Sequence, residues 1–173
     1  MTTRLIPHGP NHLENTFRWL SESKALRQQI DSLAAPISRE ANEAYWRSKW
    51  ADTSRRDFAI VVDDRHVGNC GLSFLDEARH KSELWIYIAE RKREGTGAAA
   101  LDQLMSYAFS ELKLYRVHLR VLVTNPGAYR FYLNAGFQYE GKARCDTWQD
   151  GRSIDAHLMS LLSDEYFAIK MRT

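Results

Sequence analysis

The chain has 173 residues, of which 44% are apolar and 27% charged, and its formal net charge is +2. This balance is typical of one globular domain that buries its own core, so we expect a single domain over 1–173. It disfavours a disordered chain, and it disfavours a dedicated nucleic-acid binder, which carries a larger basic excess. No apolar run reaches the roughly 18 residues of a membrane span, and the N-terminus lacks a signal-like apolar core.

The two cysteines, Cys70 and Cys145, lie far apart and have neither metal-ligand spacing nor a disulfide framework. We therefore expect a reduced, cytoplasmic setting and no metal site. Taken with the composition, the sequence also predicts no membrane partner and makes nucleic acid an unlikely one.

The first third of the chain predicts one strand followed by helices. Residues 2–8 form a short apolar strand, and the apolar residues of 11–20 recur at helical spacing. Residues 24–30 continue as a second helical piece. A further helix is predicted over 38–51, with Ser38 as its candidate N-cap.

The middle of the chain changes to the two-residue period of strands. Residues 58–75 predict a hairpin with its turn at 63–66, and 82–90 predict a further strand. In that strand Glu83 shares one face with two aromatic residues, while the aliphatic residues occupy the other face. A glycine-rich turn follows, and an amphipathic helix is predicted from Gly97 onward.

The last third predicts a strand, a helix and a hairpin. Residues 115–124 alternate between apolar and polar side chains. Asn125 is a good N-cap for the next helix, and Gly136 is placed to end it. Residues 137–162 form a closing hairpin around Asp150–Gly151. The predicted order is β-α-α-β-β-β-α-β-α-β-β, which indicates an α/β fold with a mixed sheet flanked by helices.

The turn at 92–98 follows a strand and opens a helix, which makes it a candidate anion site. Helix N-termini carry unpaired backbone N–H groups and a partial positive charge. Gly95 and Gly97 allow a ligand to approach the backbone, and Lys92 and Arg93 add positive charge. The plainer interpretation is a tight turn in which glycine only relieves strain, and the spacing fits neither common phosphate-binding glycine motif.

Two motifs in this order resemble the GNAT superfamily of acetyl-CoA-dependent N-acetyltransferases. One is the basic-x-x-G-x-G pattern from Lys92 to Gly97, and the other is N-x-x-A-x-x-x-Y-x-x-x-G-F from Asn125 to Phe137. The tail is similar to the RimJ/RimL-type branch, since it carries E-G-x-x-R from Glu140 and D-G-x-x-x-D from Asp150. The fold implied is a mostly antiparallel central sheet flanked by helices.

The resemblance implies acetyl-CoA as the acetyl donor. Backbone amides of the glycine-rich turn would hold its pyrophosphate, while Tyr87 and Ile88 would pair through their backbone with its pantetheine arm. Asn125 would contact the cofactor, and Arg130 would meet its phosphates. The family usually has Arg or Gln at the first turn position and often Gly at the second. The turn residues in this chain are Lys92, Arg93, Glu94, Gly95, Thr96, Gly97 and Ala98.

The implied reaction is direct attack of a neutral amine on the thioester. A backbone N–H near Ile88 would polarise the carbonyl oxygen. Tyr132 would stabilise the leaving thiolate by donating a hydrogen bond, because full proton transfer from a normal phenol to a thiolate is uphill by roughly 2 kcal/mol. Glu83 is the weaker candidate for the base. The alternatives are a Tyr132 with its hydroxyl at the surface and a solvated Glu83.

Other candidates carry less chemistry. His118 is expected to be a structural or exposed histidine, and Cys145 has no base beside it in the sequence. Trp46 and Trp148 are candidate substrate contacts, because a GNAT-like fold lines its acceptor cleft with the N-terminal helices and the last hairpin.

The sequence leaves the acceptor open between a protein N-terminus, a small-molecule amine and a nucleotide-linked amino sugar. A non-catalytic acyl-CoA-binding module is the alternative of another class. A homodimer is compatible with this branch, and the sequence does not decide it.

Overall fold

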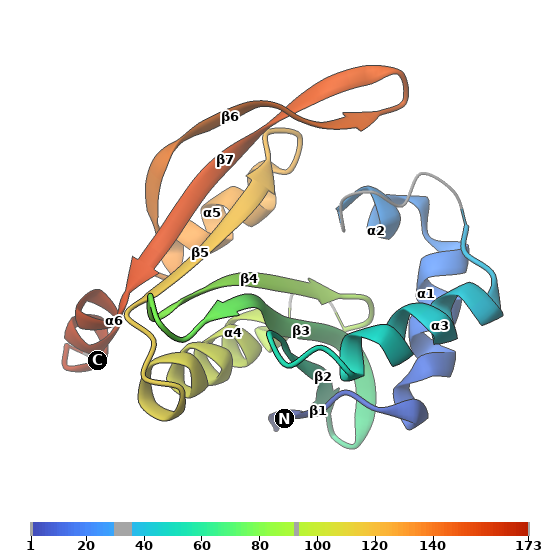
Figure 1. The fold of residues 1–173 in the computed structure, drawn as a ribbon, viewed down its shortest axis with the longest axis horizontal. Coiled ribbons are helices and arrows are strands. Elements are labelled where there is room, and N and C mark those ends of the chain that lie inside the picture. Colours follow the sequence, from blue (N-terminus) through green and yellow to red (C-terminus); the bar gives the residue numbers. More distant parts are fainter. Residues whose placement is uncertain (1, 30–35, 92–93, 173) are drawn as a thin grey trace. The chain divides into compact units, whose positions relative to one another are not determined.

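The computed structural model describes residues 2–29, 36–91 and 94–172 (Figure 1). A 3-10 turn precedes the first helix and a π-helical turn, Tyr107–Glu111, follows the fourth. The elements in chain order are β1 (Thr3–Pro7), α1 (Leu13–Glu22), α2 (Lys24–Gln29), α3 (Arg39–Trp50), β2 (Arg56–Val62), β3 (Arg65–Asp76), β4 (Lys81–Ile88), α4 (Thr96–Ser106), β5 (Arg116–Leu122), α5 (Pro126–Asn134), β6 (Gln138–Gln149), β7 (Arg152–Leu162) and α6 (Ser163–Lys170).

The strands form one sheet in the order β1-β2-β3-β4-β5-β7-β6. The pairs β1–β2, β2–β3, β5–β7 and β6–β7 are antiparallel, whereas β4 and β5 are parallel. Every predicted strand is present, and the mixed, mostly antiparallel sheet flanked by helices is confirmed.

Two helices depart from the predicted order. Ser23 ends α1 in an extended conformation (φ −104°, ψ 100°), and its hydroxyl then accepts the backbone N–H of Leu26 at 3.1 Å. A serine that ends one helix and caps the next makes α2 a separate helix. The C-terminal α6 was not predicted. It begins with acidic residues, and Glu165 accepts the backbone N–H of Leu162 at 2.9 Å.

The contacts divide the chain into two compact units. The first comprises Met1–Phe74 and Trp85–Leu104, and the second comprises Leu75–Leu84 and Met105–Thr173. The prediction of a single domain stays a prediction.

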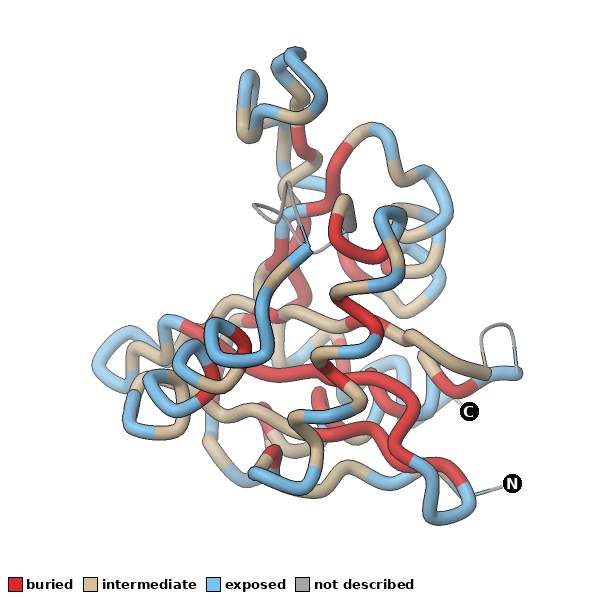
Figure 2. Tube along the Cα trace, turned by 90° about the vertical axis from the view of Figure 1, so that its right-hand side faces the viewer, coloured by how far each residue is buried: buried red, intermediate tan, exposed pale blue. Residues whose placement is uncertain are grey.

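The core of the first unit lies along its central strands. The buried positions of β2 and β3 form continuous runs, 59–62 and 66–73, which account for the red stretches of these strands (Figure 2). Helix α1 packs against both α2 and α3 (Figure 1). Trp19, Leu20 and Leu26 from these helices form a buried cluster with Tyr87 of β4. The N-terminal helices therefore rest on the strand that precedes the glycine-rich turn.

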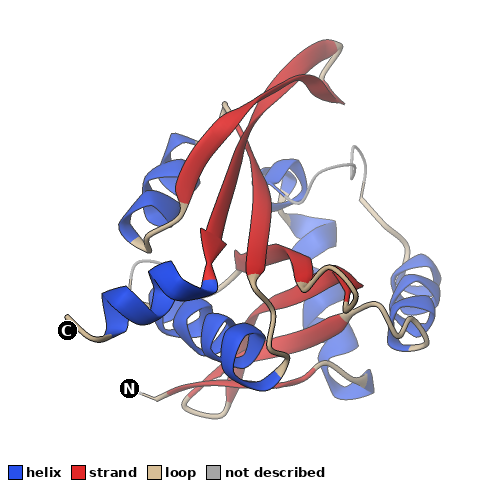
Figure 3. Cartoon of the chain, turned by 60° about the vertical axis from the view of Figure 1, so that its left-hand side comes forward, coloured by secondary structure: helices blue, strands red, loops and turns tan. Residues whose placement is uncertain are grey.

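The second unit is built on β5 and the long β6–β7 hairpin (Figure 3). Val117, Leu119 and Val121 of β5 are buried, while the alternate residues Arg116 and Arg120 are more exposed, as the alternation predicts. Helix α5 contacts β5, and α6 contacts β7. None of the described helices is long and apolar enough to cross a membrane.

Candidate functional site

A β-bulge interrupts the pairing of β3 with the end of β4. The backbone N–H groups of both Ala89 and Glu90 donate to the same oxygen, that of Val67, at 2.9 and 3.0 Å. Two successive donors opposite one acceptor define a bulge. Because backbone groups alternate in direction along a strand, the N–H of Ile88 points away from β3. This is the backbone group that the sequence analysis assigns to the carbonyl oxygen of the thioester.

Gly68 makes this close approach sterically feasible. A Cβ at this position would lie 2.3 Å from the backbone oxygen of Tyr87 and 3.0 Å from the Cα of Ile88. The first distance is far too short for a side chain and the second is at the limit, so only glycine fits opposite the bulge without a shift of the backbone.

The glycine-rich turn has the geometry of an anion site in its described part. Lys92 and Arg93 lie outside the described residues. Gly95 has a φ of +80°, and no atom lies within 4 Å of where its Cβ would be. Helix α4 begins at Thr96, whose buried hydroxyl has no hydrogen-bond partner. A helix N-terminus with an open glycine and an unpaired buried hydroxyl fits a phosphate group.

The structure also describes three further predicted members of this turn. Glu94 is exposed and pairs with Arg91 at 3.0 Å, and Arg91 also pairs with Asp63 at 3.0 Å. Gly97 and Ala98 lie in the first turn of α4, where N–H groups have no partner inside the helix. The charge of Glu94 is thus paired with a cation next to the turn.

In the second unit Asn125 caps helix α5. As predicted, its side-chain oxygen caps the helix, accepting the backbone N–H of Ala128 at 3.1 Å, and Pro126 occupies the first helical position. Arg130 is exposed on the same helix, and its Nε lies 3.4 Å from the backbone oxygen of Pro126. The contacts of Asn125 and Arg130 with a cofactor stay predictions.

Tyr132 is buried on α5, with 7% of its surface exposed. Its ring lies 5.2 Å from that of Phe131 and 5.5 Å from that of Phe137, both in edge-on arrangements. The backbone N–H of Phe137 closes the helix end by donating to the carbonyl of Tyr132 at 3.0 Å. Packing and the helix end therefore fix this tyrosine in one orientation, as a hydrogen-bond donor to a leaving group requires. Its catalytic role stays a prediction.

Glu83 is part of a charged group and is not a solvated strand end. Arg120 donates to it at 3.2 Å and to Asp146 at 3.0 Å, and the side chains of Glu83 and Asp146 are only 18% and 10% exposed. His118 faces Glu83 in the β4–β5 register, and burial lowers the pKa of this histidine. The role of Glu83 as a base stays a prediction.

The two tryptophans proposed as substrate contacts differ in exposure. Trp46 is only 3% exposed and stacks on His8 with a ring distance of 3.8 Å. Trp148 is 71% exposed near the end of β6. Trp46 is thus a core residue in this structure, while Trp148 presents its ring at the surface.

The first unit contains a cluster of three histidines that was not predicted from the sequence. His12 lies 5.2 Å from His8 and 4.8 Å from His66 between ring centres. Burial, aided by the neighbouring histidines, lowers the pKa of His8 to about 3. Burial is also the largest cause that lowers the pKa of His66 to about 4. His8 and His12 lie four residues apart before α1, whereas His66 belongs to β3, so the sequence does not signal that the third histidine joins the other two.

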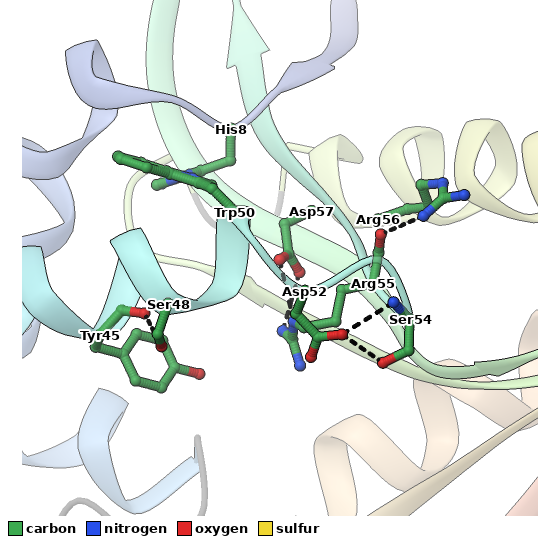
Figure 4. A network of polar contacts seen from close by, with 9 residues as sticks. All are labelled: His8, Tyr45, Ser48, Trp50, Asp52, Ser54, Arg55, Arg56 and Asp57. Atoms are coloured by element: carbon green, nitrogen blue, oxygen red, sulfur yellow. Dashed lines mark hydrogen bonds and ion pairs between the residues drawn. The ribbon is translucent and has the colours of Figure 1, made fainter.

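A polar network continues from this cluster to the start of β2 (Figure 4). Trp50 donates its indole N–H to His8 at 3.2 Å. Arg55 and Asp57 form an ion pair at 2.9 Å with side chains only 12% and 5% exposed, and burial raises the pKa of Asp57 although the arginine opposes the shift. Among the described residues no group of His, Cys, Asp and Glu is arranged to hold a metal ion.

Comparison with known proteins identifies related chains. Residues 3–138 match the model of the acetyltransferase (GNAT) domain. The Bacillus subtilis (strain 168) protein named "Putative ribosomal N-acetyltransferase YdaF" is 33% identical over 135 residues, covering 77% of this chain and 73% of that protein. The spermidine N(1)-acetyltransferase of Vibrio cholerae serotype O1 is 33% identical over 119 residues, covering 66% and 68% of the two chains.

A solved structure shares the fold over nearly the whole chain. The crystal structure of spermidine N-acetyltransferase from Vibrio cholerae in complex with CoA and spermine superposes with a TM-score of 0.87. The superposition covers 95% of this chain and 98% of the other at 22% sequence identity.

Proposed function

The chain belongs to the GNAT acetyltransferase family, and on that premise we propose that it transfers the acetyl group of acetyl-CoA directly to a primary amine. The observation that carries the proposal is the start of α4, where Gly95 leaves the backbone open and the Thr96 hydroxyl is buried and unpaired. This is the chemistry that a pyrophosphate needs. The solved neighbour in complex with CoA supports the same donor.

The chain's own residues supply two parts of the reaction. The Ile88 N–H, directed away from β3 by the bulge, would donate to the thioester oxygen as negative charge develops on it. As the amine nitrogen bonds to the carbonyl carbon and the carbon–sulfur bond breaks, the Tyr132 hydroxyl would donate to the departing thiolate. The amine loses its proton to solvent or to Glu83. This division of work needs no covalent acetyl-enzyme.

For the acceptor we propose a cationic amine, either a protein N-terminus or a small polyamine. Glu83 and Asp146 share one guanidinium, that of Arg120, so these three side chains together carry one excess negative charge. Such a group favours an ammonium over the diphosphate of a nucleotide-linked amino sugar, which needs cations. The names of two relatives, a putative ribosomal N-acetyltransferase and a spermidine N(1)-acetyltransferase, are compatible with an acceptor of this cationic class.

An acceptor screen tests this proposal. The protein is incubated with acetyl-CoA and, separately, with peptides, spermidine and a nucleotide-linked amino sugar, while free thiol is followed. We expect thiol release that depends on a cationic amine, with an acetylated product in the mass spectrum. If only the nucleotide-linked sugar were acetylated, the proposed acceptor class would be wrong. If none of the amines caused thiol release from acetyl-CoA, the proposed reaction would be wrong.

A further inference from the structure

Side-chain hydrogen bonds hold the chain on both sides of Ile88, the last residue of β4. Before it, the Asn69 amide donates to the hydroxyl of Tyr87 at 2.6 Å. After it, the Glu90 carboxylate accepts the indole N–H of Trp19 at 2.8 Å and the guanidinium of Arg18 at 2.5 Å. Trp19 and Arg18 belong to α1. The bulge that aims the Ile88 N–H is thus fixed at both ends by side chains.

Asn69 is the centre of the hydrogen bonds that precede Ile88. Its amide also donates to the hydroxyl of Thr16 in α1 at 3.0 Å, and its oxygen lies 2.8 Å from Nε2 of His66. All four side chains are buried, and Asn69 and Thr16 have no exposed surface. Asn69 therefore joins β3, β4 and α1 at one point, two residues from the carbonyl of Val67 that accepts both bulge donors.

The direction of each hydrogen bond in this network follows from the chemistry of the amide. Because both amide contacts of Asn69 are donations, its oxygen must accept, and the Nε2 of His66 must carry the hydrogen. The Thr16 hydroxyl in turn donates to the backbone oxygen of His12 at 2.9 Å. An amide cannot pass a proton along such a chain, so the network orients groups and does not conduct protons.

We propose that Asn69, acting through Tyr87 and Thr16, is a positioning residue for the Ile88 N–H in the acetyl-transfer step. This inference rests on the proposed function, in which that N–H stabilises the thioester oxygen. A donor aimed at charge that develops only in the transition state affects kcat, whereas a donor that is misplaced by a fraction of an ångström still allows substrates to bind. The network therefore acts on kcat more than on the KM for acetyl-CoA.

Two substitutions that each remove one hydroxyl test the network without leaving a large cavity in the core. Tyr87→Phe removes one hydroxyl and keeps the ring, which packs edge-on against Trp19 at 6.5 Å. Thr16→Val removes the other hydroxyl at nearly the same volume, and Thr16→Ser keeps it. We expect kcat to fall by about tenfold or more in Tyr87→Phe and Thr16→Val, with the KM for acetyl-CoA within about twofold, and to recover in Thr16→Ser.

The control for general loss of stability is Ile60→Val, which removes one methyl group from a fully buried position of β2 outside the network. It should lower the melting temperature and leave kcat unchanged. Unchanged kcat in both Tyr87→Phe and Thr16→Val, or a loss of kcat in Thr16→Ser equal to that in Thr16→Val, would overturn the positioning role. Failure of the proposed function is distinguishable, because the unsubstituted protein would then show no amine-dependent thiol release.

Discussion

At the scale of single residues, Tyr132 is the side chain whose chemistry the sequence predicts and whose placement the structure supplies. The motif from Asn125 to Phe137 marks the residue, but only the structure shows that it is 7% exposed and held between two phenylalanine rings. The histidine cluster is the opposite case. His8 and His12 are only four residues apart, but His66 comes from β3, and no local spacing predicts that it packs against them.

Replacing Tyr132 by Phe tests the proposed donor to the leaving thiolate. The substitution keeps the packed ring and removes the hydroxyl, so we expect kcat to fall by about 100-fold, the lower end of the range for acid–base catalysis. Steady-state kinetics with acetyl-CoA and the best amine of the screen measures the effect. Tyr129→Phe, one turn earlier on α5, is the matched control and should keep the parent kcat. Equal kcat in the two variants would contradict the role.

The buried histidines predict how stability depends on pH. The pKa values of His8 and His66 are about 3 and about 4 in the folded state, below the usual 6.5, so the unfolded chain binds protons first as pH falls. The stability that these two buried neutral histidines contribute to the folded state is therefore complete above pH 6.5 and is lost progressively as the pH falls towards 4. Each histidine should lower the free energy of unfolding by up to about 1.4 kcal/mol per pH unit in that window.

Urea unfolding at several pH values between 7.0 and 5.5, a range chosen to lie above the normal carboxylate pKa of about 4, measures this slope. His8→Gln should reduce it, because it removes one of the histidines whose pKa is lowered in the folded state. A slope that is flat in the parent protein, or identical in the variant, would contradict the assignment.

At the scale of elements, local signals predicted most helix ends. Ser38 and Asn125 accept the backbone N–H groups of Ala41 and Ala128, both at 3.1 Å, as their positions in the sequence predict. The capping role of Ser23 and the bulge after Ile88 were not predicted. Both depend on where the chain goes next: Ser23 must cap a new helix, and the bulge exists only because Val67 lies opposite two successive donors.

The turn before α4 should be sensitive to a single methyl group. Gly95→Ala places a Cβ in open space at a φ of +80°, so its cost to folding is the backbone strain of about 1–2 kcal/mol. A bound pyrophosphate would need that space, and we expect the Kd for acetyl-CoA, measured by calorimetry, to rise at least about tenfold.

Gly151→Ala is the matched control for this strain. It sits between β6 and β7 at a φ of +74°, again with no atom within 4 Å of the new Cβ. It should lower the melting temperature by a similar amount and leave the Kd unchanged. Equal affinities for acetyl-CoA in the two variants would show that the pyrophosphate does not bind at this turn.

At the scale of the whole molecule, the family and the sheet were predictable because two spaced motifs and the strand pattern agree along the chain. The class of acceptor was not predictable, since it depends on which charged side chains lie close together in the folded chain. Glu83 and Asp146 are 63 positions apart, yet both contact Arg120. The excess negative charge of this group is the part of the account that only the structure could provide.

In the proposed reaction the acetyl group passes directly from acetyl-CoA to the amine, without a covalent intermediate on the protein. The decisive measurement is the set of initial rates obtained while both substrates are varied. Direct transfer requires both substrates bound together, so double-reciprocal plots against acetyl-CoA at several amine concentrations should intersect. Parallel lines, the pattern of a ping-pong reaction through an acetylated enzyme, would contradict the account.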